Sequence, residues 1–229
     1  MNFPISNLCE NFDIDNPPTG IVSLWGDFGV GKTTFVLQTA LNATLYGKVI
    51  YIYSKPDLPY EKIENILSEN SSAIMENLLT LQVLDFYSLN DVISKLEILI
   101  ITNLKEKESH INFIIIDSLT DLYRLELNKE KKEKNFNLNY QLNQILATLY
   151  HLNEIYKIEV LIVNEMSRKN YIEQIKEVQS GGKVMDYWVK YSVKIERTVE
   201  LNVRKLILAK HPKNRNNELF SKLTKQGFK

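Results

Sequence analysis

Residues 26–33 constrain this chain more than any other part of its sequence. They read Gly-Asp-Phe-Gly-Val-Gly-Lys-Thr, which matches the pattern G-x-x-x-x-G-K-[ST] in full. The apolar residues 21–25 before this loop predict a buried strand, and residues 32–46 after it predict a helix. A loop of this kind turns its backbone N–H groups toward a phosphate, because glycine lets the chain approach without a Cβ in the way. The sequence therefore predicts a phosphate-binding loop.

Several side chains of this region have separate expected roles. Lys32 is expected to reach the β- and γ-phosphates of a nucleotide and to act in catalysis, while the Thr33 hydroxyl coordinates Mg²⁺. The predicted nucleotide-binding residues of the loop are Gly26, Asp27, Phe28, Gly29, Val30, Gly31, Lys32 and Thr33. Asp117 follows the apolar run at 113–116, and ligands gather at the carboxyl ends of strands in an open α/β sheet. We therefore predict Asp117 as the second Mg²⁺ residue; the alternative is a cap for the next turn.

Strands and helices alternate along most of the chain. Further strands are predicted at 49–53, 79–86, 113–116 and 159–163, and helices at 60–67, 89–105 and 138–156. After residue 183 the pattern changes to short alternating segments at 191–195, 201–208 and 219–223, which predict antiparallel hairpins. The whole predicts a single α/β domain over residues 1–229 with a short lead-in at 1–19. Its central sheet is mostly parallel and flanked by helices, with antiparallel strands added at the C-terminal end.

Composition narrows the functional class. The 28 basic and 28 acidic residues cancel, which argues against a generally basic nucleic-acid binder. The charge is uneven, however: residues 1–31 hold four acids and no Lys or Arg, whereas residues 204–229 hold eight basic residues and one acid. A lone cysteine, Cys9, and the lack of a signal peptide or of an apolar run long enough to cross a bilayer predict a cytoplasmic protein without a membrane partner.

Residues 117–126, Asp-Ser-Leu-Thr-Asp-Leu-Tyr-Arg-Leu-Glu, resemble the RecA-type recombinase ATPases, and in particular their archaeal RadA and RadB members. Other segments agree in order: the phosphate loop with Thr34, residues 48–52, residues 160–165, Gly181-Gly182 with Trp188, and residues 210–215 with Phe220 and Gly227. The resemblance covers nearly the whole chain from about Gly20. The lack of an N-terminal helical DNA-binding domain favours RadB over RadA.

The resemblance implies a RecA-type P-loop ATPase core. It adds Thr34 to the nucleotide-binding set and makes ATP, with Mg²⁺, the expected cofactor. It also implies association with single-stranded DNA and a role in homologous recombination or DNA repair. Other recombination proteins and further copies of the same chain are then candidate partners.

Residues 166–183 match the second DNA-binding loop of these recombinases. The residues expected to contact DNA are Arg168, Lys169, Tyr171, Lys176 and Lys183, four cations for phosphates and one aromatic ring for stacking. Without the resemblance, this segment reads equally well as a solvated surface loop with a net charge of +2. In the basic tail, Lys210 and Arg215 match a region that approaches the ATP of a neighbouring subunit. The alternative there is a solvated basic hairpin.

Two residues depart from the pattern of the family. The family has a glutamate after the second strand that orients the attacking water, and Lys55 stands there with donors only. Asp57, two residues on, is a poor geometric replacement. Glu165 stands where the family usually has a γ-phosphate-sensing glutamine; it stays our second catalytic candidate, although phosphate repels a carboxylate unless a cation intervenes. We therefore predict ATP binding with slow hydrolysis.

Two other functions remain open at this point. The first is a regulatory or scaffold ATPase similar to KaiC, which uses ATP to control assembly and does not bind DNA. The second is a protein without turnover that holds ATP as a structural ligand. Substitutions in the 166–183 segment distinguish the first from a recombinase, and the substitutions that restore Glu at 55 and Gln at 165 test the second.

Overall fold

The computed structural model describes residues 1–67, 75–105, 110–128, 130–171 and 174–229. Its strands are β1 (Ile21–Gly26), β2 (Lys48–Tyr53), β3 (Leu78–Gln82), β4 (Ile111–Asp117), β5 (Glu159–Tyr171), β6 (Gln174–Gln179), β7 (Val189–Arg197), β8 (Val203–Lys210), β9 (Glu218–Thr224) and β10 (Gly227–Phe228). Its helices are α1 (Leu8–Phe12), α2 (Lys32–Ala43), α3 (Tyr60–Ile66), α5 (Phe86–Lys105), α6 (Leu119–Glu126), α7 (Lys132–Tyr156) and α8 (Gly182–Trp188). Within these ranges no helix combines the length and the hydrophobicity needed to span a membrane.

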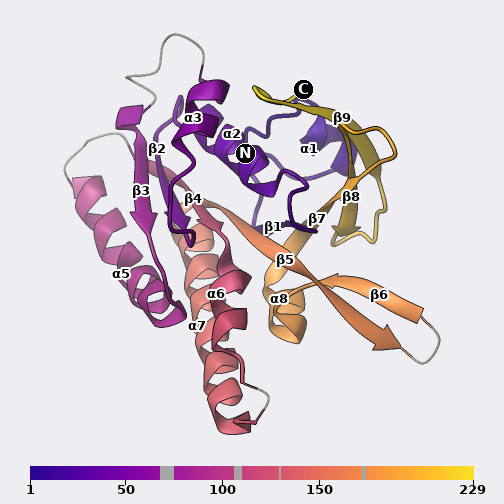
Figure 1. The fold of residues 1–229 in the computed structure, drawn as a ribbon. Helices are drawn as coiled ribbons and strands as arrows, with labels where there is room; N and C mark the ends of the chain where they lie inside the picture. The colour runs from indigo at the N-terminus through magenta and orange to yellow at the C-terminus, as the bar shows by residue number, and fades with distance from the viewer. Residues whose placement is uncertain (68–74, 106–109, 129, 172–173) are drawn as a thin grey trace.

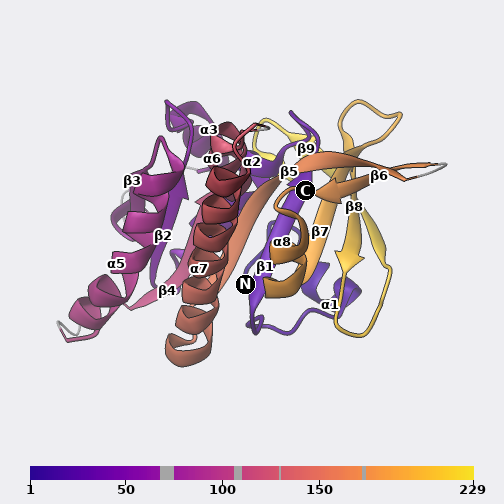
Figure 2. The same ribbon diagram turned by 90° about the horizontal axis from the view of Figure 1, so that it is seen from below.

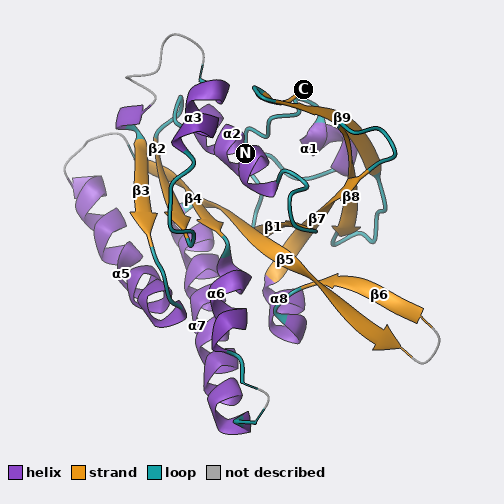
Figure 3. Ribbon diagram, viewed as in Figure 1, coloured by secondary structure: helices purple, strands orange, loops and turns teal. Residues whose placement is uncertain are grey.

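The strands form one sheet in the order β10-β9-β8-β7-β1-β5-β4-β2-β3, with β6 paired to β5 outside this path (Figures 1 and 3). The strands from β3 to β7 in this order run parallel to their neighbours, whereas β8, β9 and β10 continue the sheet in antiparallel fashion. The predicted fold class, a mostly parallel sheet with flanking helices and C-terminal antiparallel strands, is confirmed.

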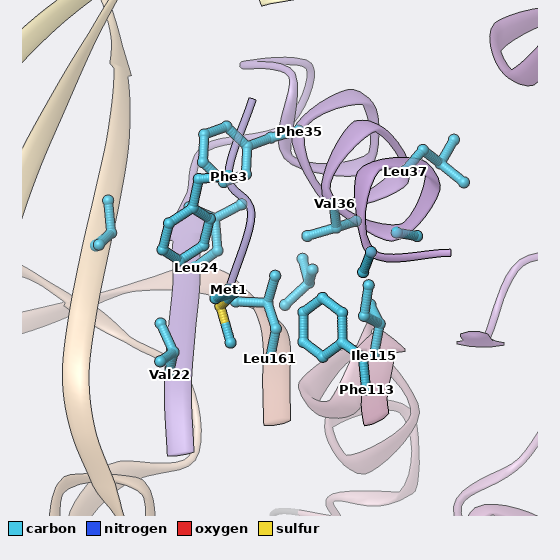
Figure 4. Close-up of a cluster of buried hydrophobic side chains, with 14 of the residues drawn as sticks. Met1, Phe3, Val22, Leu24, Phe35, Val36, Leu37, Phe113, Ile115 and Leu161 are labelled. Carbon is cyan, nitrogen blue, oxygen red and sulfur yellow. The ribbon is translucent and has the colours of Figure 1, made fainter. Parts of the chain in front are cut away.

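Helices cover both faces of the parallel strands, which explains why these strands are apolar throughout. On one face, Val22 and Leu24 of β1 pack in the same core as Phe35 of α2 and Phe113 of β4 (Figure 4). On the other face, Ile21 belongs to a second core that α5, α6 and α7 share. Figure 2 shows α5 and α7 crossing this second face of the sheet. The first face carries the helix that follows the phosphate loop.

Some boundaries differ from the prediction. The strand expected at 79–86 ends at Gln82, because the Ser88 N–H donates to Asp85 Oδ1 at 2.8 Å and α5 already begins at Phe86. The side chain of Phe86 is fully buried in the second core. The helix expected at 138–156 begins at Lys132, so it also includes the charged residues Lys132, Glu133 and Lys134. Helices α1, α6 and α8 have no counterpart among the predicted helices.

The segment expected to be a loop at 166–183 is instead a β-hairpin. Strand β5 continues through Met166 to Tyr171 and pairs antiparallel with β6. The chain then turns at Gly181 and Gly182, whose φ values of 95° and 58° favour glycine, and enters α8. In Figures 1 and 2 the hairpin extends beyond the rest of the sheet. Apolar and polar residues do not alternate regularly in this segment, so the sequence lacks the pattern that predicts a half-buried strand.

Candidate nucleotide-binding site

The phosphate loop lies between the end of β1 at Gly26 and the start of α2 at Lys32. Two of its glycines are required by space and backbone geometry. A Cβ at Gly26 would lie 2.3 Å from the carbonyl oxygen of Ile195, and Gly31 has a φ of 106°. A Cβ at Gly31 would also lie 2.9 Å from Cδ2 of Leu223. The loop therefore packs closely against β7 and β9.

Two arginines from the C-terminal part of the sheet hold the loop in place. Arg197, the last residue of β7, donates from Nη2 to the carbonyl oxygen of Phe28 at 2.8 Å. Arg204 of β8 donates from Nε to the carbonyl oxygen of Val30 at 3.0 Å. Hydrogen bonds from a charged donor are the stronger kind in proteins. The antiparallel extension of the sheet thus fixes the conformation of the phosphate loop, a role that the sequence did not indicate.

Lys32 and Glu165, the two predicted catalytic residues, form an ion pair. The ammonium of Lys32 lies 3.0 Å from Oε1 and 3.1 Å from Oε2 of Glu165, and it also donates to the carbonyl oxygens of Gly26 and Asp27. The Lys32 side chain is 7% exposed. Burial raises the pKa of the Glu165 carboxyl, and Lys32 opposes that rise. A carboxylate at position 165 needs a cation beside it if phosphate is to bind nearby. Lys32 is that cation.

A cavity of about 290 Å³ opens beside this ion pair. Its lining includes six predicted nucleotide-binding residues: Phe28, Gly29, Gly31, Lys32, Thr33 and Thr34. Lys55, Lys62 and Glu165 complete its charged wall. Phe28 is 81% exposed, so most of its ring lies in solvent. A larger hollow of about 860 Å³ lies along the first half of α7 and shares no residue with the phosphate loop, so the smaller cavity is the candidate site.

Asp117, at the end of β4, has the properties of a cation ligand. Its side chain is 2% exposed, and Oδ2 accepts a hydrogen bond of 2.9 Å from the Tyr51 hydroxyl. Burial, reinforced by Asp117, holds the pKa of Tyr51 well above its ordinary value, so Tyr51 stays a donor. Oδ1 has no hydrogen-bond partner among the described residues. A buried carboxylate oxygen without a partner suits Mg²⁺ or one of its waters.

Thr33, the other predicted Mg²⁺ residue, already has a cationic partner. The hydroxyl oxygen of Thr33 accepts a hydrogen bond of 3.0 Å from the ammonium of Lys55. Asp117 thus fits a metal ion, and Thr33 can bind one only if this hydrogen bond is shared or broken. The sequence placed Lys55 after the second strand but carried no sign that its side chain reaches Thr33.

The residues expected to contact DNA lie on and after the hairpin. Arg168, Lys176 and Lys183 are exposed, and Nε of Arg168 lies 3.8 Å from Oε1 of Glu177 across the hairpin. The side chains of Lys169 and Tyr171 lie outside the described part of the structure. Glu177 also binds the ammonium of Lys194 at 2.8 Å, which connects β6 to β7. The hairpin is therefore anchored to the sheet, while Arg168 and Lys176 face solvent.

Lys210 and Arg215 lie away from the phosphate loop of their own chain. Lys210 faces Ser192 in the β7–β8 register, whereas Arg204, which holds the loop, faces Arg197 at the other end of the pair. The ammonium of Lys210 donates to the carbonyl oxygen of Asp186, and Nη2 of Arg215 lies 3.1 Å from Oδ2 of Asp13. A contact between these cations and the ATP of a neighbouring subunit stays a prediction.

Comparison with known proteins agrees with this architecture. The model of the Rad51 family matches residues 17–228. The DNA repair and recombination protein RadB of Methanocaldococcus jannaschii is 36% identical over 201 residues, which cover 86% of this chain and 87% of that protein. RadB of Methanosphaera stadtmanae is 29% identical over 83% of this chain and 78% of its own. The DNA repair protein RAD57 of Saccharomyces cerevisiae is 30% identical over 66% of this chain and 35% of its own length. The chain therefore belongs to the Rad51 family, as a RadB-like member of the RecA-type recombinases.

Proposed function

We propose that this protein binds ATP in the cavity beside the phosphate loop, binds single-stranded DNA and serves homologous recombination or DNA repair, with slow ATP hydrolysis. The observation that carries the ATP part is the cavity lined by Lys32 and Thr33, with Asp117 at the carboxyl end of a parallel strand of the same sheet. The names of the RadB relatives support the repair part.

The side chains of the site have different tasks in nucleotide binding. The N–H groups of the loop and the Lys32 ammonium receive the phosphates, and Lys32 exchanges its bond to Glu165 for one to phosphate. Asp117 would hold Mg²⁺, joined by Thr33 where its hydrogen bond from Lys55 is shared or broken, and the ion would neutralise charge on the phosphate oxygens. Glu165 loses its cation in this exchange, and because burial already raises the pKa of this carboxyl, it takes up a proton more easily than an exposed glutamate.

Slow hydrolysis follows from Lys55. Its ammonium cannot accept a proton from water or orient a water by accepting a hydrogen bond. The variant that combines Lys55→Glu with Glu165→Gln restores an acceptor and a neutral amide at these positions. We expect it to raise the steady-state turnover of ATP at saturating Mg²⁺-ATP by at least about tenfold, which is less than the roughly hundredfold or more that a well-placed general base supplies. Release of phosphate measures this rate.

The control for this prediction is Lys62→Glu, which makes the same change of charge as Lys55→Glu in the wall of the same cavity. It is expected to leave the turnover unchanged or lower. A wild-type protein that hydrolyses ATP at about 1 per second or faster in the presence of DNA would contradict slow hydrolysis. If the restored variant stays as slow as the wild type, a structural role for ATP gains support.

Binding of DNA is proposed for the β5–β6 hairpin. Glu165, which contacts Lys32, and Arg168, which faces solvent, lie three residues apart on the same strand β5. A change at Glu165 when ATP binds can therefore reach the hairpin through the continuous backbone of β5. The test is fluorescence anisotropy of a labelled single-stranded oligonucleotide, with and without Mg²⁺-ATP, at two salt concentrations.

Under this proposal binding is sensitive to salt and stronger with Mg²⁺-ATP. The double substitution Arg168→Ala and Lys176→Ala is expected to weaken binding and to reduce the slope of log K against log salt by about 0.7 for each phosphate that the variant no longer neutralises. Lys95→Ala on α5 is the control, since Lys95 pairs with Asp91 on the exposed surface of that helix. Absence of DNA binding in all conditions favours the regulatory ATPase instead.

A further inference from the structure

Lys55 brings a second positive charge directly to the phosphate loop. It follows β2 by two residues, and its ammonium donates to Thr33 Oγ1 at 3.0 Å. Thr33 lies in the first turn of α2, next to Lys32. Lys32 and Lys55 line the same cavity, with Lys62 of α3 as a third cation and Glu165 as the carboxylate that Lys32 already neutralises. The cavity is therefore positively charged overall.

The backbone that carries Lys55 is fixed on two sides. The Gln82 carboxamide, at the end of β3, donates to the carbonyl oxygen of Lys55 at 2.9 Å and also to that of Pro56. On the other side, the Ser54 N–H donates to the carbonyl oxygen of Asp117 at 2.9 Å. The segment after β2 is thus tied to both neighbouring strands. Its position delivers the Lys55 side chain to Thr33, although the side chain itself is exposed.

The Thr33 hydroxyl has two lone pairs, and the Lys55 ammonium has three N–H donors. With one donor on Thr33, two remain for phosphate oxygens, which strongly prefer charged donors. The Lys55 ammonium thus places a positive charge beside Thr33 that belongs to the protein. In a site without this lysine, a divalent ion from solution would have to supply that charge. A carboxylate at position 55 would do the opposite and increase the need for a metal ion.

We propose that Lys55 is the resident cation of the nucleotide site and substitutes for Mg²⁺ beside Thr33, so that the protein binds ATP without a metal ion. This inference rests on the proposed binding of ATP in this cavity. It concerns binding and not hydrolysis, for which a metal ion held by Asp117 still contributes charge. Lys55 is then a specificity-determining residue that changes the metal requirement of the site.

The test compares the dissociation constant of ATP in excess Mg²⁺ with that in EDTA, by displacement of a fluorescent ATP analogue. For the wild type we expect the ratio of the EDTA value to the Mg²⁺ value to stay below about threefold. For Lys55→Met we expect a ratio at least about tenfold above that of the wild type, since one charge-assisted hydrogen bond to phosphate contributes about 1.5 kcal/mol or more and each tenfold in affinity is about 1.4 kcal/mol. Lys55→Arg keeps a cation and should keep the low ratio.

Lys62→Met is the matched control, because it removes a lysine from the same cavity without removing the contact to Thr33. It should change the affinity equally in both conditions. Equal ratios for wild type and Lys55→Met overturn the proposal, and so does a wild type that binds ATP only with Mg²⁺. A wild type that fails to bind ATP even with Mg²⁺ overturns the proposed function itself. Thermal melting of each variant verifies that it is folded.

Discussion

Lys32→Met is expected to weaken ATP binding by roughly a hundredfold, which corresponds to about 3 kcal/mol. The substitution keeps the length of the side chain and removes the ammonium that the phosphates would receive from Glu165. In the structure this ammonium is the buried centre of the site, with two carbonyl oxygens and both carboxylate oxygens around it. Titration calorimetry with ATP in excess Mg²⁺ measures the loss.

The same substitution leaves Glu165 without its cation, so folding has to be checked separately. The folded-state pKa of this carboxyl, already raised by burial, should rise further. Below that pKa the carboxyl is protonated and the lost ion pair costs little, whereas the stability of the variant falls as the pH rises through it. Addition of Glu165→Gln to Lys32→Met removes this pH dependence and leaves ATP binding weak.

Lys95→Met provides the matched control for ATP affinity. It makes the same chemical change on α5, where Lys95 forms an exposed pair with Asp91 at 2.6 Å. Exposed pairs of this kind contribute little, so neither affinity nor folding should change noticeably. If Lys32→Met binds ATP within threefold of the wild type, the cavity beside the phosphate loop is not the ATP site.

Phe113→Ala is expected to cost about 3–5 kcal/mol of the free energy of unfolding. The ring of Phe113 is 1% exposed and packs in the core shown in Figure 4, between β4 and the strands and helix beside it. The loss has two parts. The variant no longer gains the free energy of moving the ring out of water on folding, and alanine leaves a cavity in the core. Since β4 ends at Asp117, the substitution also loosens the support of the candidate metal ligand.

Phe136→Ala is the control for this stability prediction, because it removes the same ring from the surface of α7, where Phe136 is 73% exposed. Its effect should stay within about 0.5 kcal/mol, as is usual for surface positions. Urea denaturation followed by circular dichroism compares the two variants. Similar losses in both would contradict the assigned core.

The parallel part of the sheet could be predicted because each of its strands is marked by a short run of neighbouring apolar residues. Residues 21–25 and 113–116 are apolar on both faces, and such runs have few other stable environments than a covered parallel sheet. The phosphate loop was readable for a similar reason, since its glycines and Lys32 lie within eight residues. Helix α6 also has a local signal in the sequence, Ser-x-x-Asp at 118–121: the Ser118 hydroxyl accepts a hydrogen bond of 3.3 Å from the Asp121 N–H and caps the helix.

The rest of the site depends on contacts that no local pattern encodes. Arg197 and Arg204 reach the phosphate loop from more than 160 residues away, and they bind backbone carbonyls, which leave no trace in residue types. The bond between Lys55 and Thr33 depends on how β2 and α2 are placed relative to each other. The sequence predicts a loop at the hairpin because strand pairing through polar residues has no hydrophobic periodicity. Such features follow from the tertiary fold.

Strand β5 crosses the molecule without interruption, from Glu159 in the sheet to Tyr171 in the hairpin. From Glu165 to Tyr171 is six residues, or about 20 Å at roughly 3.3 Å per residue. Such a strand acts as a lever: a tilt of about 10° at Glu165 displaces the far end by about 3.5 Å at that length. This displacement is comparable to the spacing of stacked bases in nucleic acids, which is about 3.4 Å. If the hairpin binds DNA as proposed, a small change at the Lys32–Glu165 pair is therefore large enough to shift the bound strand by about one base.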